Sequence, residues 1–367
     1  MNNKGFVSKY GLFATIIVTV VGVGVFSYPS RMANEVGTDG WFVTILAGGI
    51  TFLLLSLIYR VIVKNDYDTF YIMLENNLGK IIGKVFAFIL CVYFIFSVAL
   101  GMRIFAEVIK MYLLEQTPTE FILLVMIFTG LYLVRGEVSA LVKFNEIAFF
   151  AMFIPIIIVL VFATRGGELS NVLPVLQSSP INYIKALATA TYAFGGFEIA
   201  YLILPFMKDK NGVRKTFFKS IALITVFYAI VTILCLMFFT KEHTKELLWP
   251  TITLIRAIVI PGAFIERWEG IVMALWVLFY FTTFVNMYYF SGDIIKEAFH
   301  FHDIKLSSII LSPIIYIVAL YPQNIAEVYD TSGKVTPILS VFSFIVLPLT
   351  ILFFGRLRGR GKKRNET

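Results

Sequence analysis

The 367-residue sequence is far more apolar than a typical soluble domain, with 59% hydrophobic and only 15% charged residues and a mean hydropathy of +0.85. These values exclude a water-soluble fold, and charge-free runs recur along nearly the whole length, so we expect one membrane domain over residues 1–367, surrounded by lipid. The formal net charge of +8 comes from basic residues between the apolar runs and in a tail at 356–367, which favours membrane topology over a nucleic-acid partner.

Ten apolar stretches predict an all-α integral membrane protein, because about 20 helical residues cross the hydrocarbon core of a bilayer. The predicted spans are residues 10–30, 40–61, 83–113, 120–135, 138–163, 183–206, 216–239, 268–291, 304–321 and 336–355. Before the eighth span, Pro250 to Pro261 has the amphipathic pattern of a helix that lies on the outer membrane surface. The loop from Tyr67 to Gly79 is predicted to contain another short helix.

The distribution of lysine and arginine predicts the orientation, since basic residues are retained on the cytoplasmic side. With the N-terminus inside, 21 basic residues lie on the inner side and 9 on the outer side, while Arg103 lies within the third span. We therefore expect both termini, including the basic tail 356–367, in the cytoplasm.

Glycines interrupt two of the predicted spans. The first span contains Gly22-Val23-Gly24, and the sixth contains Phe194-Gly195-Gly196-Phe197-Glu198. A helix is broken within hydrocarbon only where protein or a polar cavity satisfies its free amides and carbonyls. Broken helices at matching positions of two five-span halves, here about 10–163 and 183–355, are typical of the solute site of an inverted-repeat transporter fold. The alternative is that these glycines only allow close helix packing.

The backbone of two such breaks suits a zwitterionic amino acid. Helix N-termini attract a carboxylate, and released carbonyls accept hydrogen bonds from an ammonium group. Glu198 is the only acid in the sixth span, and an acidic side chain at this depth indicates a functional role. Three roles are open: binding the solute's cation, carrying a proton, or pairing with Arg103. Glu107, one turn from Arg103, is the alternative partner of that arginine.

Polar stripes mark two further spans. The third span carries Tyr93 and Ser97 one turn apart, and the eighth carries Thr282, Thr283, Asn286 and Met287. Such stripes either join helices or line a pocket that faces the breaks.

Lys143, Asn145 and Glu146 lie near the cytoplasmic end of the fifth span, where we expect them to reach toward the membrane interface. No lysine lies deeper in that span to replace a bound sodium ion. The sequence also has no phosphate-binding glycine loop, nucleophile elbow or zinc-ligand spacing, so we expect no enzyme activity, no metal and no cofactor.

Short segments along the whole chain together resemble the B subunit of bacterial spore nutrient-germinant receptors. They are, in order, the Gly-x-Gly break ending in Pro29, Gly40-Trp41, Leu78-Gly79-Lys80, Ala106-Glu107, Leu113 to Pro118, Trp249-Pro250-Thr251-Ile252, Phe264-Ile265-Glu266-Arg267 and Thr282-Thr283-Phe284. Each segment alone is short, and the resemblance is carried by their order and spacing.

This resemblance implies a fold similar to amino-acid permeases of the amino acid–polyamine–organocation superfamily, with a LeuT-like five-plus-five inverted repeat. It also implies a sensor of a small nutrient in the spore inner membrane, acting beside an A subunit and a lipoprotein C subunit. In this family the germinant lies between the broken first and sixth spans and the third and eighth. The site residues implied here are Gly22, Val23, Gly24, Tyr93, Ser97, Phe194, Gly195, Gly196, Phe197, Glu198, Thr283 and Met287.

Gly195 departs from the family pattern, in which a large apolar residue is commoner beside the second break. The resemblance therefore predicts a larger pocket here and a solute bulkier than alanine. The main alternative to a sensor is an amino-acid permease that alternates access across the membrane. The sequence names neither the nutrient nor a coupled ion.

Overall fold

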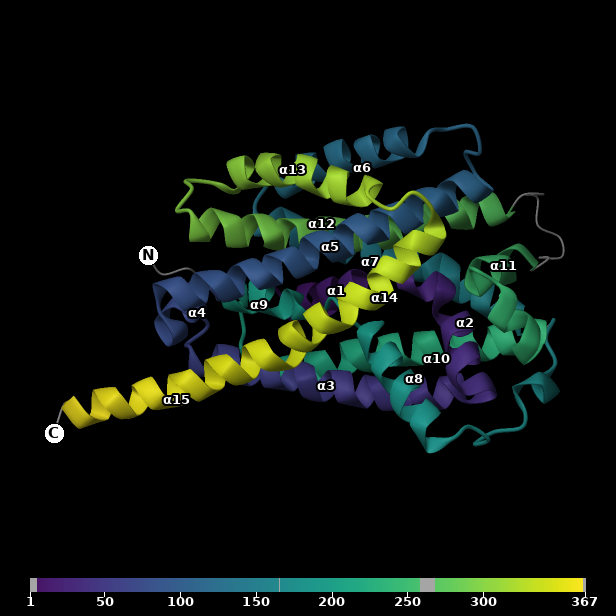
Figure 1. The fold of residues 1–367 in the computed structure, drawn as a ribbon, viewed down its shortest axis with the longest axis horizontal. Helices are drawn as coiled ribbons and strands as arrows, with labels where there is room; N and C mark the ends of the chain where they lie inside the picture. Colours follow the sequence, from purple (N-terminus) through teal and green to yellow (C-terminus); the bar gives the residue numbers. More distant parts are fainter. Residues whose placement is uncertain (1–4, 165, 258–267, 366–367) are drawn as a thin grey trace.

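The computed structural model describes the backbone of residues 5–164, 166–257 and 268–365, and the side chains of all of these except 268–275 and 358–365. This part of the chain is almost entirely helical, and its only β-pairing is an isolated bridge between Val7 and Met207. Most helices lie roughly along one axis and form a single elongated bundle (Figure 1). Both termini lie at the left end of the view, and the opposite end, which contains α11, is called the distal end below.

The helices are α1 (Lys9–Val20), α2 (Gly24–Val36), α3 (Gly40–Lys64), α4 (Phe70–Leu78), α5 (Lys80–Tyr112), α6 (Thr119–Val134), α7 (Val138–Ala163), α8 (Pro180–Tyr192), α9 (Ala200–Ile203), α10 (Val213–Glu246), α11 (Pro250–Ala257), α12 (Trp268–Ala298), α13 (Ile304–Leu320), α14 (Ile325–Val341) and α15 (Leu347–Asn365). Short 3-10 turns are η1 (Gly37–Asp39), η2 (Leu169–Val172), η3 (Phe197–Ile199) and η4 (Leu204–Phe206). A π turn, η5 (Phe342–Val346), joins α14 to α15.

Helix length and composition identify an integral membrane protein. Among the described residues, five helical segments are long and apolar enough to cross a bilayer: Gly24–Lys64, Lys80–Tyr112, Val138–Ala163, Val213–Glu246 and Ile325–Leu357. A sixth is the pair Pro180–Tyr192 and Phe197–Phe206, which is bent by 43°. The predicted fourth and ninth spans correspond to the shorter apolar helices α6 and α13, and the eighth to α12. The predicted first span, residues 10–30, corresponds to α1 and the beginning of α2. The all-α prediction is therefore confirmed.

The tenth predicted span, residues 336–355, lies within a longer helical segment, Ile325–Leu357. Its helix begins at Ile325, where the Asn324 side chain accepts a hydrogen bond from the Glu327 amide and caps the first turn. The sequence pattern placed the start at residue 336, because charges precede it. In the structure these charges stay exposed, and Lys334 pairs with Asp330 at 2.6 Å. The apolar window thus marks the hydrocarbon crossing, whereas the helix itself is longer.

Two short helices were expected outside the spans. The one in the loop after α3 is found as α4, and the other as α11, although residues 258–261 of that prediction lie outside the described residues. One face of α11 packs on the bundle, since Thr251, Ile252, Leu254 and Ile255 are all buried, whereas Arg256 is exposed. The Thr251 hydroxyl donates to the Val25 carbonyl at 2.7 Å, so α11 packs against the first broken span.

Candidate functional site

The two predicted breaks are real interruptions of helix. α1 ends at Val20 and α2 begins at Gly24, with a tight turn between them in which the Gly22 amide donates to the Val20 carbonyl at 3.0 Å. In the sixth span α8 ends at Tyr192, and Gly196 takes a φ of +112°, a backbone conformation that residues with a side chain rarely adopt. Glycine is therefore required at residue 196 by its backbone angle.

The breaks lie against each other and against α12. A Cβ atom at Gly196 would lie 3.0 Å from the Thr19 carbonyl oxygen and 3.3 Å from the Met287 methyl carbon. A Cβ atom at Gly22 would lie 2.8 Å from the Thr283 hydroxyl oxygen. These glycines therefore serve close packing as well, which was the alternative reading of the sequence.

Carbonyls released at the end of α1 accept hydrogen bonds from neighbouring helices. The Val18 carbonyl accepts from Thr282 at 2.9 Å and from Thr283 at 3.3 Å. The Tyr228 hydroxyl on α10 lies 3.4 Å from the Val20 carbonyl and 3.5 Å from the Ala193 carbonyl, so it contacts both breaks. The polar stripe on α12 thus joins α12 to α1, and Thr283 contacts the break by donating to the Val18 carbonyl.

Open space remains at the start of α2. Nothing lies within 4 Å of the position that a Cβ atom would take at Gly24, and Gly24 is exposed although it lies in the middle of the broken span. Val23, Ser97, Gly195 and Thr283 are partly exposed. The backbone at the N-terminus of α2 is thus accessible.

Glu198 is fully buried directly after the second break. Its Oε2 atom accepts a hydrogen bond from the Gly196 amide at 2.7 Å, so the carboxyl caps the start of the second half-helix. Its Oε1 atom has no hydrogen-bond partner among the described residues. The Tyr93 side chain approaches the same carboxyl from α5.

Arg103 is not the partner of Glu198. Its guanidinium pairs with Glu107 at 3.2 Å and donates to the Gln323 carbonyl at 3.0 Å, which ties α5 to the start of α14. The two alternatives that the sequence left open are thereby separated, and the pairing with Glu107 is the one observed.

The space next to Gly195, which was expected to enlarge the pocket, is occupied by the Tyr93 side chain. A Cβ atom there would lie 2.9 Å from the Tyr93 hydroxyl oxygen and 3.6 Å from the Phe344 ring. The missing side chain therefore makes room for Tyr93. Phe194 and Phe197 are fully buried. Phe194 packs on Tyr228 and Phe197 packs on Phe344, so these two side chains anchor the second break in the protein core.

Asn145 was wrongly expected at the membrane interface. Its side chain is fully buried and donates to Thr15 at 3.2 Å and to Asn286 at 2.9 Å. Asn286 in turn donates to Thr19 at 2.7 Å, so one amide pair joins α1, α7 and α12. Lys143 is exposed, as expected. The i,i+4 spacing of Thr15 and Thr19 was a usable signal for this polar face of α1.

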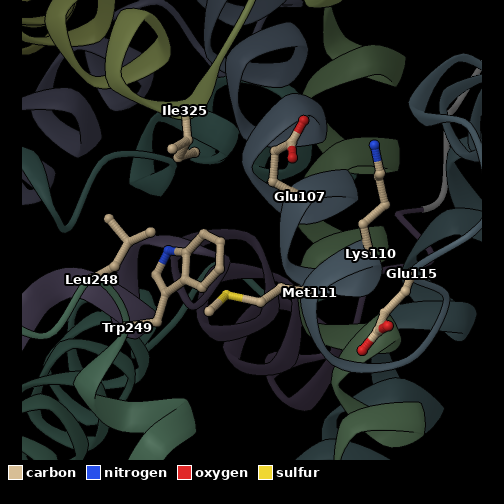
Figure 2. A pocket seen from close by; sticks show the side chains of 7 residues that line it. All are labelled: Glu107, Lys110, Met111, Glu115, Leu248, Trp249 and Ile325. Carbon is tan, nitrogen blue, oxygen red and sulfur yellow. The ribbon is translucent and has the colours of Figure 1, made fainter.

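Two cavities lie away from the breaks. One, of about 440 Å³, is at the distal end and is lined by Glu107, Lys110, Met111, Glu115, Leu248, Trp249 and Ile325 (Figure 2). The other, of about 580 Å³, is near the end that holds the termini, between α4, α5 and the end of α12. Neither is lined by a residue of the predicted site.

A helical membrane bundle whose first and sixth apolar segments are broken side by side defines a transporter-like protein of the LeuT type. A family model described as "Spore germination protein" (Spore_permease) matches residues 6–328, and the chain belongs to this family. Spore germination protein A2 of Bacillus subtilis is 28% identical over 98% of this chain and 99% of its own length. Spore germination protein GerQB of Bacillus cereus is 26% identical over 94% of each chain.

A solved structure supports the fold. A Na+-coupled sialic acid symporter in a substrate-bound, outward-open state superposes with a TM-score of 0.67, covering 93% of this chain and 80% of its own, at 11% sequence identity. At that identity the likeness concerns the fold alone. The family and the LeuT-like architecture expected from the sequence are confirmed.

Proposed function

We propose that this protein is the nutrient-binding subunit of a spore germination receptor and holds a small solute, of amino-acid class, at the meeting point of its two broken spans. The single observation that carries the proposal is the contact of Gly196 with Thr19, which brings the two broken spans together. The relatives, all named as spore germination proteins, support the biological setting.

The chemistry of the space fits a zwitterion. The N-terminus of α2 presents the positive end of a helix dipole to a carboxylate, while carbonyls at the end of α1 and the carboxyl of Glu198 are acceptors for an ammonium group. Gly22, Val23, Gly24 and Gly195 supply backbone, and Ser97 and Tyr93 supply hydroxyls from α5. Met287 and Thr283 close the space from α12. No covalent chemistry and no cofactor are required.

Signalling follows from a difference in affinity between two arrangements of the broken spans. The solute favours the arrangement in which it touches both breaks, and this biases partner subunits of the A type and the lipoprotein C type. We infer that each of the two repeats, about 10–163 and 183–355, contributes one broken span to these arrangements. Both termini lie in the cytoplasm, and the distal end lies outside.

A working amino-acid permease is the second candidate. The likeness of the fold to a symporter favours it. Exchange of labelled solute in proteoliposomes distinguishes the two, since a sensor binds without counterflow.

The proposal is tested with two glycine variants. Gly24→Leu fills the open space without a backbone clash, whereas Gly49→Leu adds the same side chain on α3, where nothing lies within 4 Å of a Cβ atom either. Labelled alanine, leucine and proline are bound to the full chain in nanodiscs. We expect Gly24→Leu to weaken binding by about tenfold or more and Gly49→Leu to leave it unchanged. Equal binding by both variants would place the solute elsewhere.

A further inference from the structure

The cavity of about 580 Å³ lies at the end of the bundle that holds the termini (Figure 1). Its walls come from α4, from the first turns of α5, and from the end of α12 with the turn that follows it. It is called the α4–α5 cleft below. None of its lining residues belongs to the predicted solute site, so the cleft is a separate feature of the fold.

The α4–α5 cleft carries a net positive charge. Lys80 and Lys84 lie one turn apart on the same face of α5, and both line the cleft. The Lys80 side chain is 89% exposed and only loosely paired, with its Nζ atom 4.0 Å from the Glu75 carboxylate. Lys84 has no ion pair within the described part of the chain, and its Nζ atom lies 4.3 Å from the centre of the Phe299 ring. Because Glu75 is the one acid among the lining residues, the cleft attracts an anion.

Two neighbouring features add to this attraction. α5 begins at Lys80, and no side chain caps its first amides, so the positive end of the helix dipole lies beside the lysines. The acids at the end of α12 are held by other groups: Asp293 accepts from Lys296 at 2.8 Å, and Glu297 accepts from the Thr69 hydroxyl at 2.9 Å. Neither of these acids lines the cleft.

The rest of the cleft is apolar and open to the surroundings. Ile81 and Val85 are 82% and 52% exposed, and each directly follows one of the two lysines along α5. The Phe88 and Phe299 rings meet edge to face at 5.8 Å and form a further apolar surface. Eight residues separate Lys80 from Phe88, so α5 rises about 12 Å from the charged end of the cleft to its apolar end. The cleft thus has the charge pattern of a phospholipid, with an anionic head and an apolar chain.

We propose that the α4–α5 cleft binds one anionic phospholipid. Its phosphate lies against the Lys80 and Lys84 ammonium groups, and one acyl chain packs along Ile81 and Val85. A basic pocket beside membrane-spanning helices is suited to such a headgroup. The bound lipid joins α4 to α5 and to the end of α12, and it therefore stabilises this end of the bundle. The site does not depend on the proposed function; only its assignment to the inner leaflet uses the orientation given there.

The test uses the full chain in detergent after removal of native lipid. Dioleoyl phosphatidylglycerol is added, its binding is measured by native mass spectrometry, and thermal unfolding is followed in parallel. Dioleoyl phosphatidylcholine has the same chains without the net charge, whereas glycerol 3-phosphate has the anionic phosphate without the chains. We expect one saturable phosphatidylglycerol adduct and a raised unfolding midpoint, with at least about tenfold weaker binding of either comparison compound.

Lys80→Gln/Lys84→Gln is expected to weaken phosphatidylglycerol binding by about tenfold or more, because both contacts to the phosphate are lost. Lys143→Gln/Lys219→Gln is the matched control, since it removes the same charge from exposed lysines in the first two turns of α7 and α10, outside the cleft. Lys84 also contacts Phe299, so each lipid-induced shift is taken from the variant's own midpoint without lipid. Lys80→Gln alone provides a second variant at a highly exposed position.

Four results would refute the lipid site. Unchanged binding in the cleft variants would place the lipid elsewhere, and equal weakening in the control would indicate attraction to the surface charge as a whole. Glycerol 3-phosphate bound as tightly as the lipid would indicate a site for a free phosphate compound. Phosphatidylcholine bound as tightly as phosphatidylglycerol would indicate an apolar groove in which the lysines have no part.

Discussion

Gly196 packs directly on the carbonyl group of Thr19, so that two segments separated by almost half of the chain touch where each helix is broken. A Cβ atom at residue 196 would lie 3.0 Å from the Thr19 oxygen, and the φ of Gly196 is +112°. The backbone angle and the close approach of Thr19 thus both require glycine at residue 196. The contact fixes one half-helix of each broken span relative to the other.

Gly196→Ala is expected to destabilise the protein and to weaken solute binding. The positive φ costs a residue with a side chain about 1–2 kcal/mol, and the Cβ atom must also push the Thr19 carbonyl away. Thermal unfolding of the purified protein in detergent, together with binding of labelled leucine, measures both effects. Gly333→Ala is the control, because nothing lies within 4 Å of its Cβ position. Unchanged stability of Gly196→Ala would contradict the contact.

Gly195→Ala is expected to be milder and to be relieved by a second change. The nearest obstacle to a Cβ atom at residue 195 is the Tyr93 hydroxyl oxygen at 2.9 Å, which is the end of a side chain. In Tyr93→Phe that oxygen is absent, whereas the Tyr192 carbonyl oxygen at 3.1 Å remains, so the double variant should recover part of the stability that Gly195→Ala loses. Unfolding midpoints of the four proteins form the cycle. Additive losses would show that the two residues do not meet.

The glycine breaks could be predicted from the sequence because a broken helix in hydrocarbon has a local signature. The partners of Glu198 and Asn145 could not, since those depend on which helix faces each side chain. Glu198 turns back to its own backbone at Gly196, and Asn145 faces the core although Lys143, two residues earlier, faces outward. Amphipathic pattern likewise predicted α11 as a helix but not the hydrogen bond that buries it against Val25.

Glu198→Gln and Glu198→Ala are expected to differ in stability. A glutamine side chain keeps an oxygen that accepts from the Gly196 amide, and it removes a charge that is costly to bury. An alanine leaves that buried amide without its acceptor, at a cost of about 1–3 kcal/mol. Thermal unfolding should therefore rank Glu198→Gln above Glu198→Ala. An equal loss in both variants would contradict the capping role of the carboxyl.

Asn145→Ala and Asn286→Ala are expected to destabilise the bundle by amounts that do not add. The two amides donate to each other at 2.9 and 3.2 Å in the fully buried space between α7 and α12. Either single variant leaves a buried amide partly unpaired, at a cost of about 1–3 kcal/mol. The double variant removes both polar groups, so its loss of stability should be smaller than the sum of the two single losses, with a coupling of about 0.5–3 kcal/mol.

Unfolding in detergent measures the cycle, and Asn182→Ala, at an exposed position on α8, controls for loss of an asparagine side chain. Strict additivity would mean that α7 and α12 are held together by their apolar contacts alone.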